Sequence, residues 1–228
     1  MRLLSNRKAT PSTRIIRIGL EGEAYSYRAG QAAWVGLDET SELTPYSIAS
    51  SPEETTRHGW LEFLVKVDGS TRFGARVSTL RHGTPILVSP PAGSFVFPDE
   101  TPEQRFLFVG GGTGIAPLRA MIRHALDRPV PGSIALLYSA RVPTEFAYAQ
   151  EFRALAREGR ITLVLTLTGA ASRWRHARGR AGLEHLAPLV AGTPPLCFVC
   201  GPASMMAEIP GTLQSLGVPP EKIRTEQW

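Results

Sequence analysis

Short apolar runs separated by turns dominate the chain as far as about residue 97. β-branched and aromatic residues are frequent in these runs, and glycine, proline and serine stand between them, which is the pattern of strands rather than of helices. The expected strands lie near residues 12–20, 32–37, 46–50, 60–67 and 85–97. Several short strands at this spacing predict a small antiparallel β-barrel.

A polar, proline-containing stretch at residues 98–104 separates this region from a different pattern. Apolar runs now alternate with longer segments of helical periodicity, which predicts a parallel sheet covered by helices. The expected strands lie near residues 105–109, 133–139, 161–168, 196–200 and 223–227, and the expected helices near 115–126, 147–158 and 203–216. The sequence therefore predicts a two-domain α+β protein, with a barrel at residues 1–98 and an α/β nucleotide-binding domain at residues 104–228.

A glycine-rich loop joins the first expected strand of the second domain to the helix after it. Residues 108–117 read FVGGGTGIAP. Gly112, Thr113 and Gly114 would let an anion approach the main chain, and N–H groups at the helix start would point at it. Pro117 fits the first helical turn. The GxGxxP spacing matches neither the GxGxxG fingerprint nor a Walker A loop, so a glycine turn without a ligand remains the alternative.

Composition excludes several classes of protein. No apolar run among the 228 residues approaches the ~20 residues that span a bilayer, so we expect a cytoplasmic protein. Cys197 and Cys200 are the only cysteines, and two thiols cannot supply the four ligands of a zinc or iron–sulfur centre, so no metal site is expected. The net charge of +5 comes from 22 arginines and three lysines against 20 acidic residues. It would suit an acidic partner, whereas the interleaved aromatic and basic residues of a single-strand nucleic-acid platform are missing.

Four further segments stand in the order and at the distances of one known family. Residues 44–50 read TPYSIAS, residues 74–78 read GARVS, residues 200–206 read CGPASMM and residues 223–228 read IRTEQW. Together with the glycine loop, they resemble the motifs of the ferredoxin–NADP reductase superfamily, flavoproteins in which a flavin-binding barrel precedes a nicotinamide-nucleotide domain. The resemblance covers essentially the whole chain. It is strongest to an oxygenase-reductase-like branch without an iron–sulfur domain.

The resemblance implies flavin-binding roles for residues of the first domain. The family's R-x-Y-S-x-x-S strand places a tyrosine against the flavin ring and a serine near N5, which implies those roles for Tyr46 and Ser47. Without the resemblance, both would read as ordinary strand residues. It also implies cofactor contacts from neighbouring positions, namely Ile48, Ser50, Val65, Gly74 and Ser78. The family arginine that neutralises the flavin phosphate is replaced here by Thr44, and we expect Arg72 or Arg76 to restore that charge.

The second domain carries the residues that the resemblance places beside the nicotinamide. The family's C-G-P-x-x-M turn implies that Cys200 lies near the nicotinamide C4 atom, with Gly201, Pro202 and Met205 in the same turn. A buried, unreactive cysteine is the alternative. The family's terminal I-x-x-E-x-aromatic pattern implies that Glu226 hydrogen-bonds in the region of Ser47 or the nicotinamide, and that Trp228 packs near the flavin or the adenine. Ser47, Cys200 and Glu226 are thus the expected catalytic residues.

Basic residues indicate the choice of coenzyme. Ser139 and Arg141 end the second strand of the second domain, where the family reads the adenosine ribose. A basic residue there favours a 2′-phosphate. Residues 174–180 read WRHARGR and add Arg180 to a cluster of arginines. We therefore expect NADPH and leave NADH open. A solvated arginine-rich loop is the alternative for this cluster.

The resemblance implies an NAD(P)H-dependent flavin oxidoreductase. Hydride would move between NAD(P)H and a flavin, for which we expect FAD and leave FMN open. Electrons would then pass to a separate acceptor such as ferredoxin, flavodoxin or an oxygenase component. Two alternatives remain: a flavin reductase that uses free flavin as a substrate, which Thr44 would favour, and a non-catalytic electron-transfer subunit. A binding module for an unrelated phosphate ligand would require five ordered segments to agree by coincidence.

Overall fold

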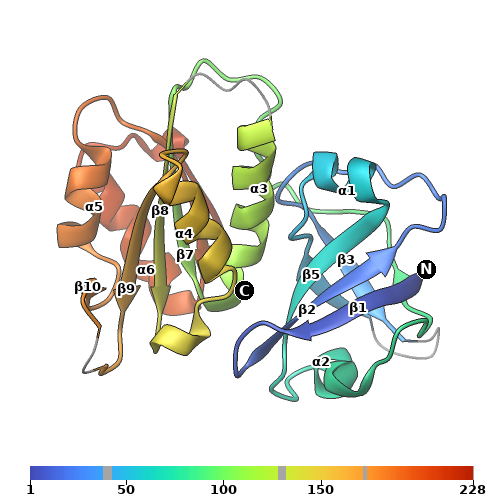
Figure 1. Ribbon diagram of the computed structural model, residues 1–228. Coiled ribbons are helices and arrows are strands. Elements are labelled where there is room, and N and C mark those ends of the chain that lie inside the picture. Colours follow the sequence, from blue (N-terminus) through green and yellow to red (C-terminus); the bar gives the residue numbers. More distant parts are fainter. Residues whose placement is uncertain (38–42, 128–131, 172–173, 228) are drawn as a thin grey trace. The chain divides into compact units, whose positions relative to one another are not determined.

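The computed structural model describes residues 1–37, 43–127, 132–171 and 174–227 (Figure 1). The chain forms two compact units. The first unit contains Met1–Phe97 and Arg119–Arg128, and the second contains Pro98–Leu118 and Pro129–Trp228. The division therefore passes through helix α3 (Ile115–Asp127), whose first turn belongs to the second unit.

The first unit is an antiparallel barrel made from two three-stranded sheets. One sheet has the order β1-β2-β5 and the other the order β4-β3-β6. Their bounds are β1 Arg2–Lys8, β2 Thr13–Gly19, β5 Trp60–Lys66, β4 Thr44–Ser47, β3 Ala32–Gly36 and β6 Leu87–Val88. Isolated bridges pair Ile48 with Phe63 and Arg2 with Pro85, so both edges of the two sheets are joined. This closure confirms the predicted barrel.

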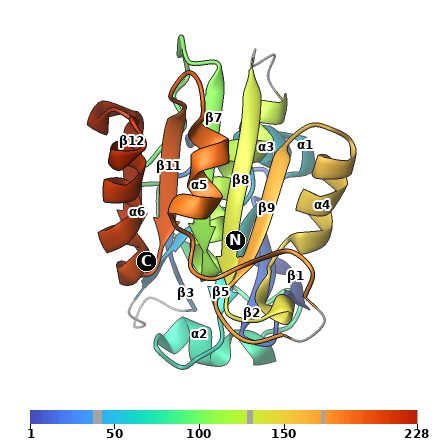
Figure 2. The ribbon, with the colours of Figure 1, turned by 90° about the vertical axis from the view of Figure 1, so that its left-hand side faces the viewer.

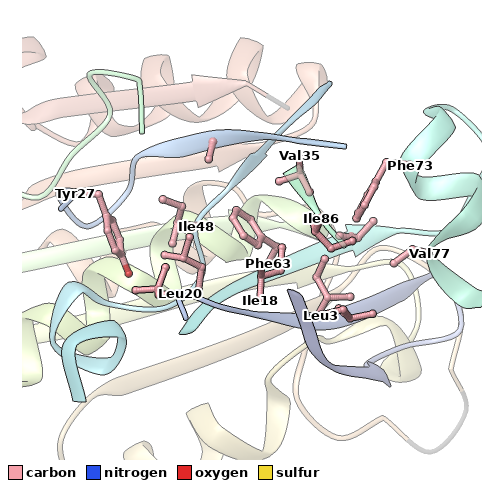
Figure 3. Close-up of a cluster of buried hydrophobic side chains, with 14 residues drawn as sticks. Leu3, Ile18, Leu20, Tyr27, Val35, Ile48, Phe63, Phe73, Val77 and Ile86 are labelled. Atoms are coloured by element: carbon pink, nitrogen blue, oxygen red, sulfur yellow. The ribbon is translucent and has the colours of Figure 1, made fainter. Parts of the chain in front are cut away.

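Alternation along the strands fills the barrel with apolar side chains. On β2, Ile16 and Ile18 point into the core, while Arg17 lies on the other face. Phe63 of β5 is completely buried and lies among side chains from both sheets (Figure 3). Burial of such large side chains stabilises the barrel by about 1.5–3 kcal/mol each. The barrel interior is therefore a packed core with side chains from β1, β2, β3, β5 and the segments around them.

Two short helices decorate the barrel. Helix α1 (Pro52–His58) begins with a capping box between Ser51 and Glu54 and ends at Gly59, whose φ of 71° is left-handed. Helix α2 (Arg72–Arg76) begins at Thr71, whose side chain accepts a hydrogen bond from the Gly74 N–H. A 3-10 turn follows at Val77–Thr79. Side-chain caps of this kind satisfy N–H groups that a helix start leaves unpaired.

The structure corrects part of the strand prediction for this unit. The region 85–97 holds only the two-residue strand β6 and two isolated bridges, which pair Pro85 with Arg2 and Ala92 with Ala32. Proline and glycine interrupt it, and proline has no N–H to donate to a sheet. The sequence analysis missed β1, because Leu3 is its only buried side chain. Helix α1 was missed as well.

The second unit is a six-stranded sheet in which every strand pair is parallel. Its order is β10-β9-β8-β7-β11-β12. The bounds are β7 Arg105–Gly111, β8 Ser133–Ala140, β9 Thr162–Leu167, β10 Ala177–Arg178, β11 Leu196–Gly201 and β12 Ile223–Gln227. Strand β7 is flanked by β8, which follows it in the chain, and by β11, which comes much later. This reversal of strand order creates a switch point between β7 and β11, where ligands of doubly wound sheets bind.

Helices cover both faces of this parallel sheet. Besides α3, they are α4 Ala149–Arg157, α5 Leu183–Val190 and α6 Ala203–Ser215, and 3-10 turns lie at Gly112–Gly114, Pro143–Glu145 and Pro220–Lys222. Helices α5 and α6 pack on one face in a cluster that includes Leu186, Leu213 and Val199 (Figure 2). On the other face, Phe152 of α4 packs edge-on against Tyr138. The predicted α/β unit is confirmed, and the additions to it are α5, which contains Pro188, and the short β10.

No helix within the described part of the chain is long and apolar enough to cross a membrane.

Candidate functional site

The glycine loop lies at the carboxyl end of β7, on one side of the switch point. A Cβ at Gly114 would lie only 2.4 Å from the carbonyl oxygen of Cys200, so a side chain cannot fit there. Gly112 has a φ of 56°, and a Cβ built on it would have no heavy atom within 4 Å. The loop thus combines a close contact between main chains with open space beside Gly112. Such a loop leading into a helix suits an anionic phosphate.

The Cys-Gly-Pro turn lies on the other side of the switch point. Cys200 and Gly110 are register partners in the neighbouring strands β11 and β7. A Cβ on Gly111 would lie 2.8 Å from the Met205 Cε and 3.0 Å from the Pro202 Cδ. The Gly201 position is similarly close to the Met205 sulfur, at 2.7 Å. The two glycine turns therefore pack directly against each other, and both precede helices.

Cys200 is a buried thiol next to a carboxylate. Its side chain has no exposed area, and its register partner on β12 is Glu226. Burial raises the pKa of the Cys200 thiol, and the negative charge of Glu226 raises it further. The thiolate, which is the reactive form of cysteine, is therefore strongly disfavoured. Cys200 is therefore not placed to act as a nucleophile, and its burial leaves only its main chain for a ligand.

The remaining predicted residues of this unit lie at other strand ends and in helix α3. Pro117 is buried in the first turn of α3, and Thr113 is half-buried. Ser139 is buried at the end of β8, beside Gly111 in the register. Arg141 follows β8 and is exposed.

Arg180 and Arg178 have different partners. Arg180 forms an exposed ion pair with Glu208 of α6, with 2.8 Å between Nη1 and Oε1. The neighbouring Arg178 instead donates to the carbonyl oxygens of Ala171 and Trp174. The Arg180 guanidinium thus lies on the surface, where a ligand could replace Glu208 as its partner.

The first unit contains the residues predicted for the flavin. The Tyr46 hydroxyl lies 2.9 Å from the Thr71 hydroxyl, which caps α2. Burial raises the pKa of Tyr46, although the hydrogen bond with Thr71 acts in the opposite direction. A Cβ on Gly74 would lie 2.7 Å from both the Lys66 carbonyl oxygen and the Thr71 hydroxyl. Tyr46 and Thr71 therefore join strand β4 to helix α2, and Gly74 lets α2 approach the end of β5.

Several predicted flavin contacts are part of the barrel's own packing. The side chains of Ile48 and Val65 are completely buried in the core, which leaves only their main chains for a ligand. The Ser50 hydroxyl bonds with Tyr27 and Thr55 and accepts from the Glu62 N–H. Ser47 is buried at the end of β4.

The remaining flavin-side predictions lie on the surface or outside the described residues. Arg72, Arg76 and Ser78 are exposed on α2 and the turn after it. Thr44 begins β4 and is half-buried. The predicted contact of Trp228 lies outside the described residues.

The sequence analysis missed a buried charged cluster in the first unit. Arg119 makes a two-pronged contact with Glu54 at 3.0 and 3.1 Å and donates to the Ala49 carbonyl at 2.8 Å. Arg119, flanked by apolar residues in helix α3, was the available signal, because a charge on an apolar helix face needs a buried partner.

Comparison with known proteins gives consistent matches. The family model described as "Oxidoreductase NAD-binding domain" matches residues 108–210. Ferredoxin–NADP reductase B of Sorangium cellulosum is 29% identical over 240 aligned positions, covering 100% of this chain and 96% of that protein. The ferredoxin reductase component of 3-ketosteroid-9-alpha-monooxygenase of Rhodococcus rhodochrous is 28% identical, covering 95% of this chain and 61% of that protein.

Solved structures share the fold over the whole chain. The crystal structure of a ferredoxin NADP⁺ reductase from Neisseria gonorrhoeae with bound FAD and NADP has a TM-score of 0.84. Its sequence is 21% identical, and the match covers 99% of this chain and 96% of that chain.

Proposed function

Because the chain belongs to the ferredoxin–NADP reductase superfamily and is an NAD(P)H-dependent flavin oxidoreductase, we propose that it binds FAD on its first unit and NADPH on its second. The observation that carries this proposal is the switch point, where the two glycine turns pack main chain against main chain. When bound, NADPH would supply a hydride, and the flavin would accept it and release electrons to another carrier. The protein's own residues bind and orient the two groups.

The second unit fits a dinucleotide. The open space beside Gly112 leaves room for a pyrophosphate, and the helix start after Gly114 offers N–H groups to it. The Cys200 thiol, held neutral by burial and by Glu226, would support the turn beside the nicotinamide without reacting with it. Arg141 and Arg180 would recognise a 2′-phosphate, because guanidinium groups match phosphate geometry. Binding of that phosphate would displace Arg180 from its ion pair with Glu208.

The first unit fits a flavin at β4 and α2. The Tyr46 ring would cover one face of the flavin, and its hydroxyl is already held by Thr71. The Ser47 hydroxyl would hydrogen-bond near the flavin N5. Arg72 and Arg76 are the exposed cations on α2 that would replace the charge absent at Thr44. The Gly74 position admits no side chain, so α2 stays close to the end of β5.

The acceptor is proposed from the relatives' names and from charge. The two relatives described above are a ferredoxin–NADP reductase and an oxygenase reductase component. A ferredoxin, a flavodoxin or an oxygenase component would therefore receive the electrons. The net charge of +5 suits an acidic carrier.

A second candidate function uses flavin as a substrate. Thr44 occupies the position of the phosphate-neutralising arginine, which would weaken flavin retention. A colourless purified protein that reduces added FAD or FMN with NADPH would favour this candidate. A protein that keeps its yellow colour through desalting would favour the prosthetic flavin.

Replacement of Ser47 tests the proposed chemistry. In Ser47→Ala, we expect the rate of flavin reduction in a single anaerobic turnover to fall about tenfold or more, because one hydrogen bond near N5 is worth about 1–2 kcal/mol. The KM for NADPH should stay within about twofold of the wild type. Ser215→Ala, at the exposed end of α6, is a control for a general loss of a hydroxyl. An unchanged rate in Ser47→Ala would remove Ser47 from the mechanism.

A further inference from the structure

Helix α3 inserts a guanidinium into the barrel unit, where it contacts the chain that follows strand β4. Arg119 is buried, and so are the two carboxylates beside it, Glu54 of α1 and Glu62 of β5. Its Nη1 lies 3.0 Å from Glu54 Oε2 and 3.7 Å from Glu62 Oε1, and its Nη2 lies 3.1 Å from Glu54 Oε1. Such fork-to-fork contacts fix a guanidinium in orientation as well as in position.

The same guanidinium donates to the main chain just after Ser47. Nη1 of Arg119 lies 2.8 Å from the carbonyl oxygen of Ala49. The Ala49 N–H donates to the Glu62 carbonyl at 2.7 Å, and the Ile48 N–H donates to the Gln31 carbonyl at 2.9 Å. The Ile48 N–H, the Ala49 N–H and the Ala49 carbonyl therefore each have a hydrogen-bond partner. Arg119 supplies the partner of the Ala49 carbonyl.

The two carboxylates are themselves held in place. The Ser51 N–H donates to Glu54 at 3.0 Å, and Arg123 Nε lies 3.4 Å from the same side chain. On the other side, Arg17 Nε donates to Glu62 at 2.8 Å. Burial raises the pKa of Glu54, but the charge and hydrogen bonds of Arg119 outweigh burial, and the pKa lies below its ordinary value. Glu54 is thus a fixed carboxylate that orients Arg119.

We propose that Arg119 is a positioning residue for flavin reduction, because its guanidinium, oriented by Glu54, holds the Ala49 carbonyl and thereby the main chain that carries Ser47. The inference rests on the proposed function of Ser47 and names a residue that touches neither cofactor. Lysine cannot replace arginine here, because one ammonium group cannot match the planar set of contacts to Glu54 and Ala49. A displacement of about 1 Å at a reacting centre lowers a rate by up to about a hundredfold.

The test combines Arg119→Lys with Ser47→Ala in protein saturated with FAD. In Arg119→Lys, we expect the single-turnover rate of flavin reduction to fall about tenfold, with the KM for NADPH within about twofold of the wild type. In the Ser47→Ala background, Arg119→Lys should cause no further loss, because its effect acts through Ser47. The inference would be overturned if the double variant lost the product of the two single-variant losses in rate, or if Arg119→Lys kept the wild-type rate.

Hydrogen exchange on the protein without ligands gives a second readout. Amides of residues 48–50 should exchange at least about tenfold faster in Arg119→Lys, while those of β2 keep their wild-type protection. Equal protection of residues 48–50 in both proteins would overturn the inference.

A double variant guards against a folding failure. Arg119→Met with Glu54→Gln removes both charges of this pair together, and the buried Glu62 keeps its ion pair with Arg17. This double variant should meet the same criteria as Arg119→Lys. Loss of the native circular dichroism in both variants would assign Arg119 to folding and overturn the positioning role. If the wild type itself reduces no flavin, the proposed function fails, and the inference fails with it.

Discussion

Cys200 shows at the residue scale how surroundings decide what a matched motif residue can do. The C-G-P-x-x-M pattern marks it as a site residue, yet burial and Glu226 keep its thiol protonated. Its neighbour Cys197 faces the α5–α6 side of the sheet, and burial raises the pKa of Cys197 to about 12. Both cysteines are therefore small packing residues at neutral pH.

Thiol labelling tests this description. At pH 8, a disulfide reagent such as Ellman's should leave both cysteines of the native protein unmodified, because the thiolate is the attacking form. In denaturant both thiols should react, since their pKa returns to about 8.5. Rapid labelling of one thiol in the native protein, lost in Cys200→Ser and retained in Cys197→Ser, would contradict the buried neutral state of Cys200.

Coenzyme choice is also decided by single residues. Arg141→Ala and Arg180→Ala should each raise the KM for NADPH about tenfold or more and leave the KM for NADH within about twofold, because a hydrogen bond to a charged group contributes about 1.5–3 kcal/mol. The exposed Arg157→Ala on α4 is the matched control and should change neither value. Equal losses for NADPH and NADH would rule out recognition of a 2′-phosphate.

The sequence predicts site residues where a motif is local and misses those that depend on contacts across the chain. The glycine loop and the Cys-Gly-Pro turn are each recognisable as a short contiguous sequence motif, and the structure places them side by side. Ser50 fits the motif equally well, but its hydroxyl serves Tyr27, Thr55 and Glu62. Arg119 lies 65 residues from its partner Glu54, and no local pattern encodes that distance.

At the scale of elements, burial on both faces makes strands predictable. The strands β7, β8 and β11 are continuous apolar runs, the signature of a parallel sheet covered by helices. Strand β1 has one buried side chain, and helix α5 contains an internal proline. Strand β1 therefore lacks the alternation that identifies a strand, and proline disfavours the interior of a helix, so both elements escape detection.

The junction of the two glycine turns gives a prediction at this scale. Gly114→Ala should lower the free energy of unfolding by about 1–3 kcal/mol, because its Cβ would overlap the Cys200 carbonyl and the Gly201 nitrogen. Binding of NADP⁺ should weaken as well. Urea unfolding and calorimetry measure the two effects.

The matched control for this change is Gly211→Ala in α6. A Cβ on Gly211 meets no heavy atom within 4 Å, and alanine favours a helix over glycine by about 0.5–1 kcal/mol. Gly211→Ala should therefore be neutral or stabilising. A Gly114→Ala protein with wild-type stability and NADP⁺ affinity would contradict the tight junction.

At the scale of the whole molecule, the chain divides between Phe97 and Pro98, where the polar stretch begins, and again inside a helix, where local patterns give no sign of a division. Periodicity predicts a single helix near residues 115–126, and helix α3 is continuous. Its contacts nevertheless assign Arg119–Arg128 to the barrel unit and the first turn to the nucleotide unit. Such a division follows from packing between distant segments, which periodicity does not report.

The central claim for the molecule is that one chain accepts a hydride from NADPH onto a flavin. The most direct test is the visible absorption spectrum of the desalted protein, recorded without oxygen before and after addition of NADPH, with FAD then added in excess. We predict that the flavin absorption bleaches with about one NADPH per flavin. Flavin absorption that neither NADPH nor NADH changes, with FAD or FMN in excess, would contradict the claim.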